Sequence, residues 1–279
     1  MVFGIASALA LAGCSAAPQP QAKNGPTIVS LNPCLDAILV EVARPEQIGA
    51  LSHYSHDPAS SSIAQNIARK YPVTGGTAEE IIAINPDLVL ASTFIAPATK
   101  AALEKAGLRV ETFGSPASVD ESTDQVSALA QLIGREDAGR QLVDRISASL
   151  ALPDPSSRPI TALLWQPGEI VAGDASLIWD QLRHHGLSNH AADMGLGQAD
   201  RVSLEAVLAD PPQLLLIAGG AAGQSHPLLD RLADTHVVQF DPSLFYCGGP
   251  SIIEAGRRLN EIQEGYASRT MQEVAEDAG

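Results

Sequence analysis

The hydrophobic pattern of the chain changes repeatedly between short apolar runs and longer segments with apolar residues at helical spacing. In the first half, the short runs predict strands at residues 27–31, 48–51, 87–91 and 108–112. Helical patterns lie between them, at residues 33–43, 63–70 and 98–106. Because strands that alternate with helices form parallel sheets, we expect an N-terminal α/β lobe over residues 27–115.

The same alternation returns in the last part of the chain. Strands are predicted at residues 160–165, 213–218 and 237–240, and helices at 176–185, 227–233 and from 251 onward. We therefore expect a second, C-terminal α/β lobe over residues 158–268. The acidic tail that follows, residues 269–279, is expected to be frayed.

The segment between the two lobes, residues 116–157, has a different pattern. Residues 118–151 contain neither Pro nor a β-rich run, and their apolar positions follow helical spacing. Gly134 is expected to divide them into two helices, of which the second covers about 136–150 and ends before Pro153. Because the second helix lies midway along the chain, we interpret it as a single long α-helix that joins the lobes.

Two stretches of the chain, residues 77–90 and 203–216, resemble each other. The identical pairs are Glu79 with Glu205, Ala83 with Ala209, Pro86 with Pro212, Leu88 with Leu214, and Leu90 with Leu216. Each copy has a hydroxyl residue suited to cap a helix, a Glu in the first turn, a Pro that ends the helix, and then a buried strand. We therefore expect two similar lobes, each with one acidic helix start; the alternative is a chance resemblance between two ordinary α/β units.

Composition narrows the class of partner. The chain has 279 residues, 45% of them apolar, which is enough to bury a large core in one or two domains. Its formal net charge of −15 disfavours binding to nucleic acid or to an anionic membrane surface and suits a basic protein partner. No apolar run reaches the roughly twenty residues that a membrane helix needs, so we expect no span in the mature chain.

The start of the sequence is typical of an exported protein. Residues 2–12 form a short apolar core, so residues 1–14 are interpreted as a signal peptide. Residues 11–14, Leu-Ala-Gly-Cys, resemble the lipobox of bacterial lipoproteins, which predicts a periplasmic protein tethered to a membrane through lipidated Cys14. Residues 15–26 read as a flexible tether. The alternative is a plain signal peptide with an incidental Cys, because no Lys or Arg precedes the apolar core.

Candidate ligand-binding residues follow the predicted strands, because open α/β sheets bind ligands at the carboxyl ends of their strands. They are Asn32, Cys34, His53, Tyr54, His56, Thr93, Phe94, Trp165, Gln166, Phe245, Tyr246 and Cys247. Their aromatic rings suit a large, flat or partly apolar ligand whose orientation is set by a few polar groups.

Histidine and cysteine residues within this set leave two alternatives open. His53 and His56, with Cys34 and Cys247 nearby, can ligate a metal or the metal of a chelate, or the histidines simply hydrogen-bond the loop or the ligand. Cys34 and Cys247 can form a disulfide or stay free in an oxidising compartment. Because a bridge between lobes would restrict their opening, we expect the two cysteines not to be bridged.

The sequence contains none of the catalytic motifs that indicate an enzyme, such as a nucleophile elbow, a His-Glu-x-x-His zinc motif or a phosphate-binding loop. An enzyme is therefore the minor interpretation.

Taken together, the lipobox, the tether, the duplicated helix and strand, and the helix between the lobes resemble the periplasmic binding proteins of cobalamin and ferric-siderophore importers. The resemblance covers residues 27–265 and is firmest at 28–33, 79–90 and 203–216. It implies two Rossmann-like lobes with a ligand cleft between them, small lobe movements, and a monomer. By position, Glu79 and Glu205 would dock onto Arg residues of the two permease subunits, and Tyr54 matches a ligand-stacking Tyr.

The function implied by this resemblance is that of the substrate-binding component of an ABC importer. Such a protein captures a ferric siderophore or a corrinoid and delivers it to a permease dimer with its ATPase. It has no cofactor of its own, because iron or cobalt arrives with the ligand, and it is not an enzyme. The alternative is an exported metal- or heme-binding protein, or an enzyme, that uses the His and Cys residues of the cleft.

Overall fold

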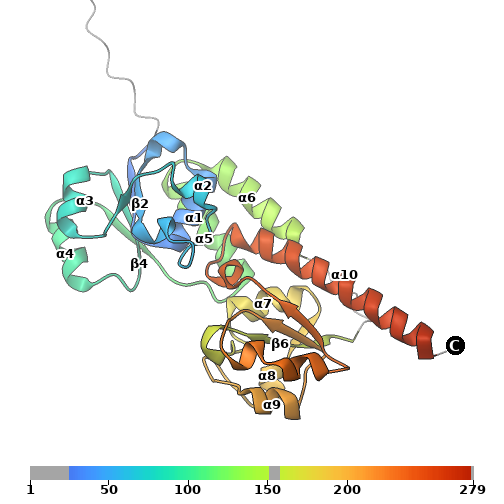
Figure 1. The fold of residues 1–279 in the computed structure, drawn as a ribbon. Helices are drawn as coiled ribbons and strands as arrows, with labels where there is room; N and C mark the ends of the chain where they lie inside the picture. Colours follow the sequence, from blue (N-terminus) through green and yellow to red (C-terminus); the bar gives the residue numbers. More distant parts are fainter. Residues whose placement is uncertain (1–24, 151–157, 278–279) are drawn as a thin grey trace, which may run out of the picture.

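The computed structural model describes residues 25–150 and 158–277 (Figure 1). The predicted signal peptide, Cys14 and its lipobox, the tether up to residue 24, and Pro153 lie outside the described residues. The described chain forms two lobes, each built on a parallel sheet that is flanked by helices. The α/β fold with two lobes that the sequence predicts is therefore confirmed.

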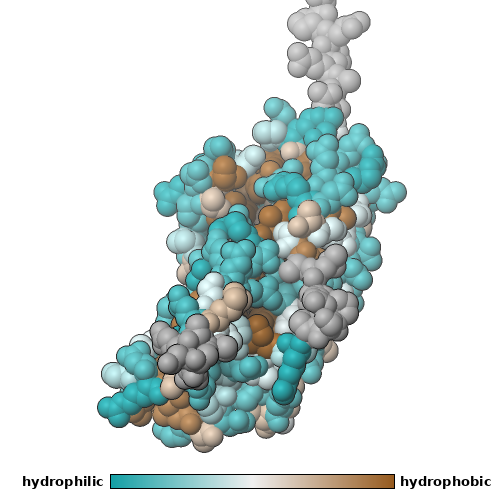
Figure 2. All heavy atoms as spheres, turned by 90° about the vertical axis from the view of Figure 1, so that its right-hand side faces the viewer, coloured by the Kyte–Doolittle hydropathy of each residue, from teal (hydrophilic) through white to brown (hydrophobic). Residues whose placement is uncertain are grey.

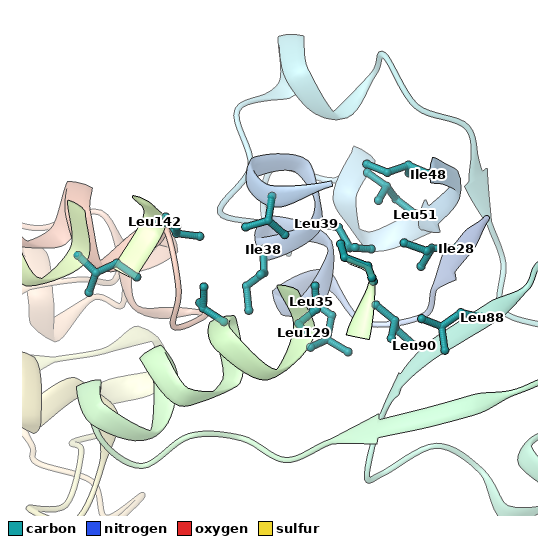
Figure 3. Packing of buried hydrophobic residues seen from close by; sticks show 14 of the residues in the cluster. Ile28, Leu35, Ile38, Leu39, Ile48, Leu51, Leu88, Leu90, Leu129 and Leu142 are labelled. Carbon is teal, nitrogen blue, oxygen red and sulfur yellow. The ribbon is translucent and has the colours of Figure 1, made fainter. Parts of the chain in front are cut away.

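The first lobe is built on a sheet in the order β3-β2-β1-β4-β5. Its strands are β1 (Ile28–Ser30), β2 (Ile48–Ser52), β3 (Val73–Thr74), β4 (Leu88–Ser92) and β5 (Val110–Phe113). Helices α3 (Ala78–Ile84) and α4 (Pro97–Lys105) pack through Ile81 and Leu103 on one face. The other face carries α1 (Pro33–Val42), α5 (Val119–Leu132) and α6 (Glu136–Ser149). The apolar side chains between this face and its helices form the largest cluster of the lobe, part of which is shown in Figure 3.

The second lobe is built on a sheet in the order β7-β6-β8-β9. Its strands are β6 (Ile160–Trp165), β7 (Leu187–Asn189), β8 (Leu214–Ile217) and β9 (His236–Gln239). Helices α7 (Leu177–His184) and α10 (Ser251–Asp277) cover one face, with Trp179 and Leu259 in the core. The opposite face packs against α8 (His190–Asp193) and α9 (Leu204–Ala209) through Ala191 and Val207.

The remaining helical segments are short. The predicted helix at residues 63–70 is reduced to α2 (Gln65–Ala68), and the one at 227–233 is the 3-10 helix η5 (Pro227–Arg231). The other 3-10 helices are η1 (Pro45–Gln47), η2 (His53–His56), η3 (Pro167–Glu169), η4 (Gly223–Ser225) and η6 (Pro242–Phe245).

The duplicated segments occupy corresponding places in the two sheets. β4 follows α3 and pairs with the first strand of its lobe, β1, while β8 follows α9 and pairs with β6, the first strand of the second lobe. The caps correspond as well, because Thr77 accepts a hydrogen bond from the backbone of Glu80 and Ser203 accepts one from Ala206. The helix, turn and strand that the sequence predicts in each copy are thus present.

The segment between the sheets is helical and divides at Gly134, as expected, but it does not stand apart from the first lobe. α5 and α6 pack against each other, and Val126, Leu142 and Ile146 belong to the core of that lobe. The long helix that contacts both lobes is α10, which begins with Ile252 in the first core and continues with Leu259 in the second. α10 continues to Asp277, so the acidic segment is helical as far as the structure describes it, rather than frayed (Figure 1).

The face of the protein shown in Figure 2 is mainly hydrophilic, and its hydrophobic residues gather in separate patches. Within the described ranges, the structure has no helix that combines the length and the apolar character needed to cross a membrane.

Candidate functional site

Three adjoining hollows form a cleft along the carboxyl ends of the first sheet and across to the second lobe. We call them the first section (about 410 Å³), the central section (about 230 Å³) and the second section (about 560 Å³) of the cleft. Ser92 lines both the first and the central section, and Ser176 lines both the central and the second section. The cleft therefore lies where parallel α/β sheets place their ligands.

The first section lies entirely on the first lobe and presents aromatic rings. Tyr54 is 45% exposed and Phe94 is 84% exposed, and both line the section. The ring of His53, which also lines it, lies with its centroid 4.0 Å from that of Tyr54. Large exposed rings in a hollow are available to a ligand, because their apolar surface is not used by the core.

A buried carboxylate holds the loop that carries Tyr54. Asp36, in the first turn of α1, is fully buried. Its Oδ2 accepts hydrogen bonds from the backbone N–H of Ser52 at 2.9 Å, and from the hydroxyls of Ser52 and Ser55 at 2.6 Å each. Ser52 and Ser55 stand on either side of His53 and Tyr54, so these bonds fix both ends of the short loop.

Burial also changes the acidity of Asp36. Removal from water raises the pKa of its carboxyl from 3.8 to about 6, against the opposing effect of hydrogen bonds from Ser30, Ser52 and Ser55. Asp36 Oδ1 is buried without a hydrogen-bond partner within the described structure.

A disulfide between Cys34 and Cys247 lines the central section. The sequence leaves bridged and free cysteines as alternatives and favours free ones, and this expectation is wrong. Cys34 lies in the first turn of α1, which is capped by Asn32, and Cys247 lies in the loop between η6 and α10. Both cysteines line the central section together with residues of both lobes, so the bridge joins the two lobes within the cleft.

Two aromatic residues precede Cys247 in this section. Phe245 stacks on Phe240 with ring centroids 4.7 Å apart, and so belongs partly to the second core. Tyr246 is 42% exposed and lines the central section with Phe245. Tyr246 therefore presents the more accessible ring to a ligand.

The second section is lined in part by a loop that the sequence analysis did not predict, residues 173–177. The backbone N–H of Gly173 donates to Oε1 of Gln198 at 2.7 Å, and Asp174 accepts a hydrogen bond from the side chain of Asn189 at 2.8 Å. Ser176 caps α7 by accepting from the N–H of Trp179. The Gly-Asp-Ala-Ser run at residues 173–176, before a predicted helix, could have indicated this loop. It was not selected because it does not directly follow a predicted strand.

Four of the predicted ligand residues do not line the cleft. Trp165 is fully buried in the second core, where its Nε1 donates to the carbonyl of Val202 at 3.1 Å. The carbonyl of Gln166 accepts a hydrogen bond from the side chain of Gln224. Thr93 is exposed beside the first section, and His56 contacts the carbonyl of Ala68 through Nε2 at 3.1 Å. Asn32, Cys34, His53, Tyr54, Phe94, Phe245, Tyr246 and Cys247 do line it.

The proposed metal site at His53 and His56 is not assembled in the described part of the chain. His53 lies against Tyr54, whereas His56 bonds the main chain of α2. Across residues 25–150 and 158–277, the structure brings together no group of three or more His, Cys, Asp or Glu side chains suited to hold a metal ion. The sulfurs of Cys34 and Cys247 are joined to each other and offer no thiolate to a metal.

Hydrogen bonds connect the lobes beside the cleft. The N–H of Val119, at the start of α5, donates to Oδ2 of Asp180 on α7 at 2.7 Å. The N–H of Gly249 donates to the hydroxyl of Ser122 at the same distance. These contacts, with the disulfide and α10, hold the two lobes at several points close to the central section.

Glu79 and Glu205 are both exposed, in the first turns of α3 and α9. The hydrogen bonds of its own backbone N–H and of Ser203 lower the pKa of Glu205, so this carboxylate is ionised at neutral pH. The neighbouring Glu80 accepts hydrogen bonds from Thr74 and from the N–H of Gly75, which lower its pKa, and is thereby tied to its own lobe. The two corresponding carboxylates are thus accessible, as docking residues need to be.

Solved structures share this architecture. The periplasmic heme-binding protein RhuT from Roseiflexus sp. RS-1 superposes with a TM-score of 0.63 at 23% identity, covering 86% of this chain and 97% of its own. The heme-binding protein HutB of Vibrio cholerae gives 0.67 at 18% identity, covering 85% and 98%. The vitamin B12 binding protein BtuF of Vibrio cholerae gives 0.63 at 19% identity, covering 88% and 98%. At these identities the likeness shows the fold.

Comparison of the sequence with known protein families identifies the family of this chain. No curated protein matches the sequence significantly. The sequence profile of the periplasmic binding proteins matches residues 28–240, which include both sheets and most of the cleft. The chain therefore belongs to the periplasmic binding protein family.

Proposed function

We propose that this protein is the substrate-binding component of an ABC importer. It captures a ferric siderophore or a corrinoid in the cleft and delivers it to a permease dimer, without making or breaking a covalent bond. The observation that carries this proposal is the cleft itself, which runs from the exposed rings of Tyr54 and Phe94 past Tyr246 to the loop at Asp174.

The family membership supports delivery to a permease, and the fold neighbours include proteins that bind heme and vitamin B12. The exposed side chains of Glu79 and Glu205 supply the docking contacts in this proposal, since a Glu on each lobe can meet an Arg through paired hydrogen bonds. Export and lipidation at Cys14 would keep the protein next to its permease. The metal in the ligand is cargo, and the protein needs no cofactor of its own.

Direct capture of a bare metal ion is less well supported. His53 and His56 have different partners, and Cys34 and Cys247 are joined in a disulfide. An enzyme that uses these same residues loses its nucleophile for the same reason, because a disulfide sulfur is not a thiolate.

Calorimetric titration with cyanocobalamin, heme and ferric siderophores tests the binding step. We expect one of these chelates to bind with 1:1 stoichiometry and to be released unchanged. Uptake of that chelate by cells with and without the gene tests the delivery step. Chemical conversion of the ligand, or tight binding of a bare transition metal in place of every chelate, would contradict the proposal.

A further inference from the structure

The cleft contains almost no charged side chains. Among the described residues that line its three sections, there is no Lys or Arg, although the sequence has 17 of them. Within the same set, Asp174 in the second section is the one carboxylate and His53 in the first section is the one imidazole. Sites for carboxylates, phosphates and other anions normally carry Arg or Lys, whose N–H groups neutralise the charge.

Two basic residues that lie near the lining in the sequence are bound to other groups. Arg183, on α7, donates to the backbone carbonyl of Asp174 at 2.9 Å and to Oδ1 of Asp180 at 3.2 Å. It therefore holds the main chain of the loop at residues 173–177 against α7. Lys100, which follows the lining residue Thr99, pairs with Glu104 at 3.9 Å along α4. Neither cation is therefore left to hold an anionic ligand.

Helix N-termini are the other common source of anion binding, and several point to the cleft because they follow parallel strands. Asn32 accepts hydrogen bonds from the N–H groups of Cys34 and Leu35 in α1. Ser118 and Ser176 cap α5 and α7 in the same way. The protein itself thus satisfies part of the N–H donors that an anion would use at these three helices.

Two further features reduce the attraction for an anion. α4 has no capping side chain, but Pro97 at its start removes one of the N–H donors. Acidic residues, Asp36, Glu121 and Asp180, lie in the first turns of α1, α5 and α7, which disfavours an anion at the positive end of each helix dipole. The field of a chain with a formal net charge of −15 acts in the same direction.

Apart from Asp174 and His53, the polar side chains on the lining are hydroxyls and amides. The exposed rings of Tyr54, Phe94 and Tyr246 lie among them. Amides and hydroxyls hydrogen-bond neutral polar groups, and aromatic faces attract neutral or cationic surfaces rather than anionic ones.

We infer that the cleft selects metal chelates that carry no net negative charge. Neutral corrinoids rich in amide groups and neutral or cationic hydroxamate complexes of iron share this chemistry. Heme, with its two carboxylates, and ferric tris-catecholates, which are strongly anionic, do not. This inference rests on the proposed function and defines the substrate class of the same cleft.

A panel of four probes tests the charge preference by calorimetry at low and at physiological salt: cyanocobalamin (neutral), ferrioxamine B (cationic), heme and a ferric tris-catecholate (both anionic). We expect cyanocobalamin or ferrioxamine B to bind at least about 10-fold more tightly than either anion. Whichever of the two binds more tightly shows whether the cleft prefers a corrinoid or a hydroxamate siderophore. Tighter binding of heme or of the catecholate overturns this inference but leaves the importer function standing. Binding of none of the four overturns the proposed function as well.

A change of charge in the cleft provides the second test. Asp174→Asn should weaken ferrioxamine B by about 3-fold with little effect on cyanocobalamin, because only the cation gains from the carboxylate. Asp174→Lys should strengthen the tris-catecholate by about 10-fold. The matched control is Asp230→Lys, at an exposed residue of η5 outside the cleft lining, which should change neither. Equal losses for the neutral and the cationic probe in Asp174→Asn would show that the carboxylate only holds its loop, and would overturn its role in charge selection.

Discussion

Cys34 and Cys247, which are 213 residues apart in the sequence, are joined by a disulfide with their Cα atoms 5.1 Å apart. The bridge connects the first turn of α1, in the first lobe, to the loop that leads from the second sheet into α10. It lines the central section of the cleft, beside the hydrogen bond between Gly249 and Ser122. Relative movement of the lobes is therefore restricted to motions that leave this junction in place, such as a small hinge or shear about it.

Removal of this bridge should destabilise the protein, since a disulfide that closes a loop of this length strongly limits the unfolded chain. For Cys34→Ser combined with Cys247→Ser, we expect a loss of about 2–5 kcal/mol in the free energy of unfolding, measured by urea denaturation. Reductant should lower the midpoint of the wild type but not that of the double variant. Titration of free thiols in the denatured, unreduced protein gives an independent check, and two reactive thiols from these positions would contradict the structure.

Asp36 should make stability depend on pH between about 4 and 6. Its pKa is raised from 3.8 in the unfolded chain to about 6 in the folded protein, so the folded state holds the proton more tightly. The resulting stabilisation is complete below pH 3.8 and is lost as the pH rises through 6. A shift of this size corresponds to about 3 kcal/mol.

The variant Asp36→Asn isolates this contribution, because it cannot ionise. The difference in unfolding free energy between wild type and variant should fall by about 2.4 kcal/mol from pH 4 to pH 7, and ligand affinity should change with it if Ser52 and Ser55 position Tyr54. Glu46→Gln, at an exposed residue of η1, is the control and should give a difference that does not vary with pH. A flat difference for Asp36→Asn would show that this carboxyl titrates normally.

Glu79 and Glu205 should act in transport but not in ligand capture. For Glu79→Ala with Glu205→Ala we expect uptake to be abolished, because each loss leaves an Arg of the permease without its partner and weakens docking by about 10-fold or more. Ligand affinity in solution should stay within about 2-fold, because neither residue lines the cleft. The control pair Glu46→Ala with Asp230→Ala removes one exposed carboxylate from each lobe and should preserve uptake. Loss of ligand affinity in the Glu79 and Glu205 variant would count against docking.

Phe94 should contribute to affinity without contributing to stability. Its side chain is 84% exposed, so Phe94→Ala should change the free energy of unfolding by less than about 0.5 kcal/mol. If the ring stacks on the chelate, the same variant should weaken binding by about 1 kcal/mol, which is about 5-fold. Met271→Ala, at another exposed apolar residue on α10, should change neither quantity. An unchanged affinity in Phe94→Ala would place the ligand away from the first section.

The order of elements could be predicted because it depends on residues that are neighbours in the chain. Apolar runs, helical spacing, caps such as Thr77 and Ser203, and the break at Gly134 each act within a few positions. The duplicated segments also predict that Glu79 and Glu205 lie in the first turns of two helices, where the structure shows both exposed. Tyr54, Phe94 and Tyr246 could be predicted to line the cleft because they follow strands of parallel sheets, which form clefts at their carboxyl ends.

Contacts between distant segments determine which side chains are buried and which cysteines pair, and local sequence patterns do not contain this information. Asp36 lies on a helix near the start of the chain, and its burial depends on hydrogen bonds from Ser52, at the end of β2, and Ser55, in η2. Trp165 ends a strand like the residues that reach the cleft, but the side of the sheet to which it points is filled by the second core. The disulfide and the contribution of α10 to both lobes depend on the path of the chain between distant segments. The sequence by itself therefore determined the elements and the two-lobe class, while only packing between remote residues decided which side chains line the cleft.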